Sequence, residues 1–351
     1  MPEKINMQLQ CPMPQFDFDV ITLGHGSGGL LTHRLLKSGV FDILKNDLLD
    51  QQHDGAVFEM NGKMAFSTDS YVIAPIFFPG GNIGDLAVNG TVNDLTMCGA
   101  IPQYLSLAFI IEEGFQIKEF WEILVSIKNA ATTAGISIVT GDTKVVEKGK
   151  GDKIYVNTSG VGLIHPKAQI HHKNIKVGDQ IIVSGNIASH GMAIMSLREG
   201  LEFESTIISD TVSLKSTVIP LIETFGTAIH FMRDPTRGGV ASVLNEIAEL
   251  TQLGFYLEQK NLPIDEQVDS ACEMLGLDPL YVANEGLFLA IVKKDIAPHF
   301  LAALRNDPNG KNAAIIGEVT NDNGGKVIMK SRIGGKRMVT YLTGEQLPRI
   351  C

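Results

Sequence analysis

Short apolar segments alternate with longer amphipathic segments along the whole chain, and this alternation is what most constrains the fold. Residues 104–111 and 136–139 are apolar runs typical of buried strands, whereas residues 118–135 place their apolar side chains on one helical stripe. The same mixture resumes after residue 180. Interleaved strands and helices predict mixed α/β sheets covered by helices. Because 351 residues exceed one ordinary domain, we expect two domains.

A change in composition at residues 165–180 separates the two halves of this pattern. The stretch reads HPKAQIHHKNIKVGDQ and is followed by a new apolar segment. We place the domain boundary near residue 170. The prediction is an N-terminal domain over residues 1–170, a C-terminal α/β domain over 171–340, and a tail over 341–351.

Local patterns predict the individual elements. A hairpin of two strands is expected to turn at Asn61 and Gly62, because Asn-Gly favours the type I′ turn. Helices are expected near 83–98, 118–135, 190–200, 214–225, 238–252 and 295–305, and strands near 104–111, 136–139, 153–164, 181–185, 255–258, 287–293, 313–318 and 326–330.

The chain carries a formal net charge of −10, and no basic cluster stands out. Phosphate contacts need Lys and Arg in quantity, so nucleic acid is not an expected partner. No apolar run reaches the ~18–20 residues that cross a bilayer, and the N-terminus lacks the features of a secretory signal. We therefore expect a cytoplasmic protein with no membrane partner, in which Cys98 and Cys272 are free thiols in the core.

A glycine-rich loop, LGHGSGG, stands between an expected strand and an expected helix. It satisfies G-x-G-x-x-G, but the following VFDILKNDLLD looks helical, and no Walker A lysine follows the loop. The residues Gly26, Ser27, Gly28 and Gly29 either approach phosphates closely or form a structural turn.

Four separated aspartates lie at ends of elements or on a helix, beside Gly, Ser or Thr. They are Asp69, Asp94, Asp142 and Asp234, and Asp94 shares a helical stripe with small residues such as Gly90. Each alone is more often a cap or a turn residue. Together they suit Mg²⁺, which takes oxygen ligands and bridges carboxylates to phosphates.

Other polar residues extend this set. Gly238 and Gly239 precede a well-patterned helix whose N-terminus could face an anion. Glu285 precedes the apolar strand LFLAIV and is either a general base or a solvated loop acid. Lys144 follows Asp142 closely. No transition-metal site is proposed, since the histidines have no visible partners.

Several motifs, taken in order along the chain, resemble the HypE family of hydrogenase maturation proteins. This family lies within the superfamily of aminoimidazole ribonucleotide synthetase and selenophosphate synthetase. The final PRIC singles out HypE within the superfamily. The motifs are LGHGSGG, STDSYV, GDLAVNGTVNDLTMCGA, GDTKV, RDPTRGG, NEGLFLA and PRIC.

The resemblance implies the superfamily's two-domain fold, a homodimer joined through N-terminal domains in a joint β-barrel, and ATP with Mg²⁺ in a cleft. It assigns metal and phosphate roles to the four aspartates and places Asp85 and Asn89 in the same matching helix. The stretch QQHDGAVF departs from the superfamily pattern, so no role carries over to Asp54.

The resemblance also implies that Cys351 carries the reacting group. A HypF-type carbamoyltransferase would place a carboxamide on its sulfur, and the chain would dehydrate that group to a thiocyanate with ATP. The cyanide would then pass to iron on a HypC–HypD complex. Glu285 and Lys144 are the candidate bases.

Two alternatives remain from the residues alone. One is an ATP-dependent synthetase of the same superfamily acting on a free small molecule, with Cys351 incidental. The other is a nucleotide-binding scaffold that only presents a thiol. Removal of Cys351 separates the dehydratase from the synthetase, since a synthetase would keep its turnover.

Overall fold

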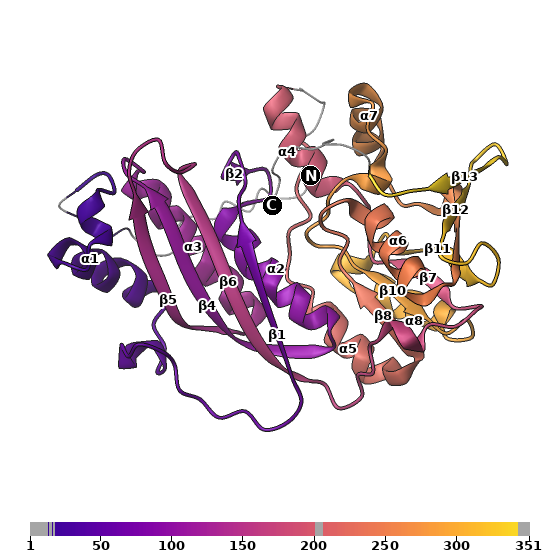
Figure 1. Ribbon diagram of the computed structural model, residues 1–351, viewed down its shortest axis with the longest axis horizontal. Coiled ribbons are helices and arrows are strands. Elements are labelled where there is room, and N and C mark those ends of the chain that lie inside the picture. Colours follow the sequence, from indigo (N-terminus) through magenta and orange to yellow (C-terminus); the bar gives the residue numbers. More distant parts are fainter. Residues whose placement is uncertain (1–12, 14–15, 17, 201–205, 343–351) are drawn as a thin grey trace.

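The chain forms two main β-sheets that lie side by side, and Figure 1 shows the first at left and the second at right. The computed structural model describes residues 13, 16, 18–200 and 206–342. The expected mixed α/β class is confirmed. Strand β6 ends at Ile164 and β7 begins at Gln180, so the boundary placed near residue 170 falls between the sheets. The division into domains remains a prediction.

The first sheet has four strands and is covered on one face only. Its order is β1 (Met64–Tyr71), β6 (Ile154–Ile164), β4 (Ala100–Glu112) and β5 (Ser137–Val146). Strands β4 and β5 run parallel and are joined by α3, whereas the other neighbours are antiparallel. Figure 1 shows α2 and α3 behind this sheet, while its front face carries no helix. The helices are α2 (Ile83–Met97) and α3 (Ile117–Ala134).

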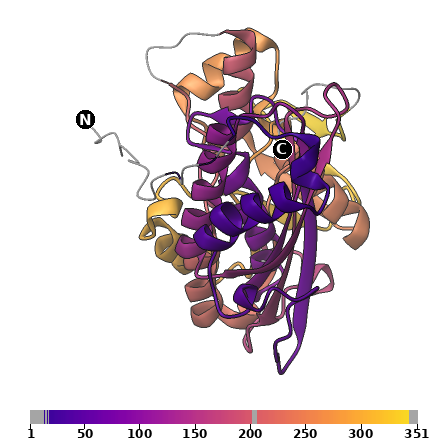
Figure 2. The ribbon, with the colours of Figure 1, turned by 90° about the vertical axis from the view of Figure 1, so that its left-hand side faces the viewer.

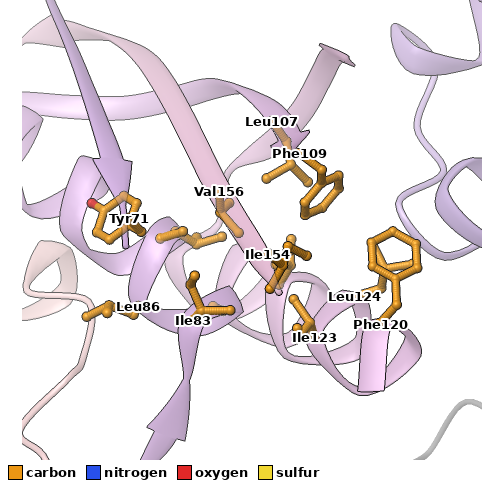
Figure 3. Close-up of a cluster of buried hydrophobic side chains, with 14 of the residues drawn as sticks. Tyr71, Ile83, Leu86, Leu107, Phe109, Phe120, Ile123, Leu124, Ile154 and Val156 are labelled. Atoms are coloured by element: carbon orange, nitrogen blue, oxygen red, sulfur yellow. The ribbon is translucent and has the colours of Figure 1, made fainter. Parts of the chain in front are cut away.

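The first core lies between this sheet and its two helices. Alternate residues of β4, such as Leu107 and Phe109, point toward Phe120 and Ile123 of α3 (Figure 3). The rings of Phe109 and Phe120 meet edge to face, with centroids 5.3 Å apart. This packing fixes which side chains of each strand face the helices, because successive strand residues point to opposite faces.

The second sheet has seven strands and is covered on both faces. On β7, Ile181 and Val183 pack in one core with α6, whereas Ile182 packs in another with α5 and α8. The sheet order is β13 (Lys336–Val339), β12 (Val327–Lys330), β9 (Gly254–Glu258), β11 (Ala314–Thr320), β7 (Gln180–Val183), β10 (Leu289–Val292) and β8 (Ile229–Arg233). The helices of this half are α4 (Ser189–Glu199), α5 (Lys215–Phe225), α6 (Gly239–Thr251), α7 (Glu266–Leu275) and α8 (Ala297–Arg305).

The glycine-rich segment lies at the outer end of the first sheet, against β5 (Figures 1 and 2). It forms a 3₁₀ turn (Leu23–Gly26), then α1 (Leu30–Leu35), then a π-helical turn (Leu36–Phe41). The short strand expected before the loop is reduced to a single bridge between Val20 and Gln116. A two-residue pair, β2 (Phe77–Phe78) with β3 (Gly81–Asn82), precedes α2.

The hairpin predicted at Asn61 and Gly62 is wrong. Residues 56–61 form no strand, and β1 pairs with β6 instead, from Met64 with Leu163 to Tyr71 with Val156. Asn61-Gly62 favours a turn locally, but β1 pairs with the distant strand β6. In this sheet the inward face of β1 is buried against α2, and this tertiary context outweighs the local preference.

Most other elements occur where the patterns predicted them, and the misses have simple causes. Helix α7 was not predicted, and neither was β8, in which His230 interrupts the apolar run and Arg233 ends it. Cys272 is buried as expected, but Cys98 is exposed, because it caps the C-terminus of α2 at the surface. Among the described residues, no helix is both long and apolar enough to cross a membrane.

Replacing Phe120 with Ala should lower the free energy of unfolding by about 3–5 kcal/mol, because the buried ring is lost and a cavity remains. Ile333, which is 97% exposed, is the matched control: Ile333→Ala should change it by less than about 0.5 kcal/mol. Chemical denaturation measures both. Similar losses in the two variants would contradict this description of the core.

Candidate functional site

Four carboxyl groups from both halves of the chain lie near one another beside α2. Asp69 lies on β1, Asp94 on α2, Asp234 just after β8, and Glu285 just before β10. The Ser67 hydroxyl donates to Asp94 Oδ2 at 2.7 Å and so links β1 to α2. We call these four residues the acid cluster. It contains three of the four aspartates predicted to bind metal, together with one predicted base.

Burial and mutual repulsion raise the proton affinity of this cluster. Burial, and then the neighbouring Asp69 carboxylate, raise the pKa of Asp94, although the Ser67 hydrogen bond opposes them. Burial and the charge of Asp94 raise the pKa of Asp234 to about 7. Burial, followed by the charges of Asp210 and Asp234, raises the pKa of Glu285 well above its usual range. Such a group of buried carboxyls favours bound protons or a bound cation.

The Glu285 loop is held from both halves of the chain. The backbone N–H groups of Glu285 and Gly286 donate to the Asp210 carboxylate, each at 3.1 Å. Asn93 of α2 donates from Nδ2 to the Glu285 carbonyl at 3.2 Å and to the Val212 carbonyl at 2.9 Å. The sequence analysis missed Asn93 and Asp210. Asn93 adjoins Asp94 in the motif VND, whereas only the fold reveals the role of Asp210.

The glycine loop borders a pocket of ≈ 380 Å³ beside β5. A Cβ on Gly26 would lie 2.6 Å from the Val145 backbone nitrogen, and Gly28 has φ +79°, so both positions need glycine. Gly29 is the N-cap of α1. The polar lining comes from Ser27, Gly28, Thr32, Asp142 and Lys144, and the apolar lining includes Leu36, Val40, Phe41, Leu107 and Phe109.

Asp142 and Lys144 are not part of the acid cluster in a single chain. Lys144 Nζ lies 2.8 Å from Asp142 Oδ1, and this contact lowers the pKa of Asp142. The register places Asp69 level with Gly141 across three strand spacings, or roughly 14 Å. Gly141 lies on the same, inward side of the sheet as Asp69. Successive strand residues point to opposite faces, so the side chains of Asp142 and Lys144 point to the open face.

Gly238 and Gly239 are required by backbone geometry at the start of α6. Their φ values are +71° and +59°, in the region that favours glycine. A Cβ on Gly239 would lie 2.6 Å from the carbonyl oxygens of Leu280 and Val282. These glycines turn the chain directly after Asp234.

Asp85 and Asn89 both lie on α2 and contact other parts of the protein. Asp85 contacts the start of the helix, whereas Asn89 contacts a residue of the second half of the chain. Asp85 Oδ1 accepts from the Asn82 backbone N–H at 2.7 Å, and Asn82 Oδ1 accepts from the Gly84 N–H, so the two residues cap the helix. Asn89 Nδ2 lies 3.5 Å from Thr211 Oγ1.

The predicted carrier Cys351 lies outside the described residues, as does Cys11. Within the described part of the chain, no three His, Cys, Asp or Glu side chains are grouped so that they alone could hold a metal ion. Asp54 is exposed.

Two family descriptions match the chain. They are "AIR synthase related protein, N-terminal domain" over residues 52–164 and "AIR synthase related protein, C-terminal domain" over residues 176–330. The carbamoyl dehydratase HypE of Bradyrhizobium diazoefficiens is 47% identical over 94% of this chain and 96% of that relative. The chain belongs to the HypE family.

Solved structures of this family match the fold closely. The hydrogenase maturation protein HypE in complex with ATP is 44% identical, covers 94% of this chain and 99% of its own, and has a TM-score of 0.91. A HypE–HypF complex is 43% identical, covers 90% of this chain and 100% of its own, and has a TM-score of 0.78. The resemblance to the HypE family inferred from the motifs is therefore confirmed.

Asp85→Asn should flatten the pH dependence of stability between about pH 4 and 6. Burial raises the pKa of Asp85 from 3.8 to about 6 in the folded protein, so the folded state keeps a proton that the unfolded chain loses earlier. The stability from this group is full below the unfolded pKa and is lost as the pH rises from there through 6, by about 3 kcal/mol. Asn retains the acceptor for the Asn82 N–H without titrating.

Denaturation of both proteins from pH 4 to 8 measures this difference. Equal pH slopes would contradict the assignment.

Proposed function

We propose that this chain is an ATP-dependent carbamoyl dehydratase. It converts the S-carboxamide of Cys351 to a thiocyanate, which supplies the cyanide ligand of the iron centre in [NiFe]-hydrogenase maturation. Family membership supports the activity. The single observation in the fold that supports it most is Glu285, a buried carboxyl near Asp69, Asp94 and Asp234. One of its oxygens has no hydrogen-bond partner among the described residues.

The reaction needs an activated leaving group. Oxide leaves very poorly, so the carboxamide oxygen attacks the γ-phosphorus of ATP, and the bond from that phosphorus to ADP breaks. The C–O bond then breaks with phosphate as the leaving group, while both protons leave the nitrogen and C≡N forms. The balance is R–S–CO–NH₂ + ATP → R–S–CN + ADP + phosphate + H⁺.

Glu285 is the base in this proposal. Its burial raises its affinity for a proton, and its loop is fixed by hydrogen bonds to Asp210 and Asn93. A fixed carboxylate needs no reorganisation when it accepts a proton. Lys144 remains the second candidate base, although its side chain is 64% exposed and ion-paired with Asp142 in one chain.

The acid cluster fits Mg²⁺. Burial, followed by the neighbouring carboxylates, raises the pKa of Asp94 and of Asp234, and a divalent cation would offset this repulsion. Mg²⁺ commonly takes one or two carboxylates together with waters and substrate phosphates. Because the three side chains do not enclose an ion by themselves, we propose Asp69, Asp94 and Asp234 as ligands together with waters and phosphate oxygens, and Asp142 stays a predicted ligand. When bound, the ion neutralises triphosphate charge and aligns the γ-phosphoryl group.

The pocket beside the glycine loop is the proposed entry point for the nucleotide. A solved relative binds ATP. Here Gly26, Ser27 and Gly28 line the pocket together with apolar side chains such as Leu36, Val40 and Phe41. Such a mixed lining suits a planar base with a polar chain attached. Gly238 and Gly239 would lie near the metal-bound end, after Asp234.

The proposed partners follow from the reaction. A relative has been solved as a complex with HypF, so a HypF-type carbamoyltransferase is the proposed donor of the carboxamide. A HypC–HypD complex is the proposed acceptor of cyanide, and the cytoplasm is the proposed location.

A homodimer is proposed through the open face of the first sheet. Large apolar side chains are exposed on this face, including Phe66 at 73% and Ile110 at 44%. Both edge strands, β1 and β5, have a free edge within the described residues. A second copy would cover the face and could bring its own β5, with Asp142 and Lys144, toward β1 of the first chain.

Intact mass measurement tests the activity. Incubation with the carbamoyltransferase and carbamoyl phosphate should add one carboxamide at Cys351, and Mg-ATP should then remove one water. Cys351→Ala should accept no carboxamide while still binding ATP. Absence of an adduct with an active transferase, or turnover that survives in Cys351→Ala, would favour the small-molecule synthetase instead.

Phe66→Asp should convert the dimer to a monomer, because a buried unpaired charge would face the partner copy. Ile333→Asp, on an exposed loop of the other half, is the control and should leave the dimer intact. Light scattering coupled to size exclusion gives the masses. A Phe66→Asp protein that remains dimeric at low micromolar concentration would refute this interface.

A further inference from the structure

Among the described residues, two buried oxygen atoms in or beside the acid cluster have no hydrogen-bond partner. They are the hydroxyl of Tyr71, a residue 1% exposed, and Oε1 of Glu285, a residue 3% exposed. More than nine-tenths of buried polar groups in proteins are paired, so an unpaired one indicates a missing water, ion or ligand. Here the two atoms come from different halves of the chain.

The fold brings these residues to neighbouring turns of α2. The Tyr71 hydroxyl lies directly over Gly90, where an added Cβ would be 2.1 Å from it. The Glu285 carbonyl accepts from Asn93, three residues further along the helix. Residues three apart are adjacent on a helix surface. Figure 3 shows the hydroxyl at the edge of the core, pointing away from the other labelled side chains.

Within the described part of the chain, the polar side chain beside this hydroxyl is that of Thr91. The neighbouring Thr91 hydroxyl is already paired with the Thr158 hydroxyl at 2.6 Å. A neutral phenol has one O–H donor and free lone pairs.

We propose that Tyr71 Oη and Glu285 Oε1 together bind the nitrogen of the carboxamide, an inference that rests on the proposed function. An amide nitrogen has two N–H donors, and the two oxygens are acceptors for both. The amide oxygen is left free for phosphoryl transfer.

The test is Tyr71→Phe, which removes one oxygen and keeps the ring. The variant should accept the carboxamide at Cys351 and bind ATP as the wild type does, yet lose water from the carboxamide at least about tenfold more slowly, as expected for one lost hydrogen bond in the reacting state. Single-turnover intact mass follows this step. Tyr256→Phe, on β9 of the second sheet, is the matched control and should keep the wild-type rate.

Stability separates this role from a structural one. Because the hydroxyl has no hydrogen-bond partner among the described residues, its removal should leave the unfolding midpoint unchanged or raise it. Dehydration within twofold of the wild type, or a slower rate accompanied by matching destabilisation, would overturn the proposal. A wild-type protein that accepts the carboxamide but never loses water would instead refute the proposed function, and this inference with it.

Discussion

Asn93 is the side chain on which the relation between the two halves of the chain depends. It is fully buried on α2, and it donates to the carbonyls of Val212 and Glu285 while accepting from the Leu214 N–H at 2.8 Å. Each of these partners belongs to the second half. A buried amide satisfied at both ends leaves little freedom to the groups that it joins. The Glu285 loop therefore has a fixed position relative to Asp94, the next residue of the same helix.

This arrangement places the carboxyls of the acid cluster close together, which is electrostatically unfavourable when they are ionised. Burial and the neighbouring carboxylates raise the pKa of Asp94, Asp234 and Glu285, so these three groups hold protons more tightly than in water. A fold optimised only for stability would avoid such a group. Perturbed carboxyls of this kind concentrate at sites that bind cations or move protons. The oxygens of Tyr71 and Glu285 that have no partner among the described residues lie close to these perturbed carboxyls.

Much of the fold could be predicted from the sequence, because α2, α3 and the strands that flank them have clear apolar periods. The aspartates and Glu285 were found because each ends an element or shares a stripe with small residues. Other features depend on strand register. No local pattern reports that Asp142 faces away from Asp69, that β1 pairs with β6, or that Asp210 holds the Glu285 loop. The sequence analysis assigned no role to Tyr71, because the surroundings of its hydroxyl come from residues distant in the chain.

The one-sided covering of the first sheet divides each strand between two tasks. On β1, Ser67, Asp69 and Tyr71 face the helix, whereas Phe66 and Thr68 face outward. Inserting or deleting one residue in such a strand would exchange the two sets, because side chains alternate with period two. One such event would move the acid cluster to the open face and the apolar side chains into the site. A change in strand length would therefore disturb more side chains than a single substitution would. Family members should accordingly differ by substitutions within these strands and by insertions only in the loops between them.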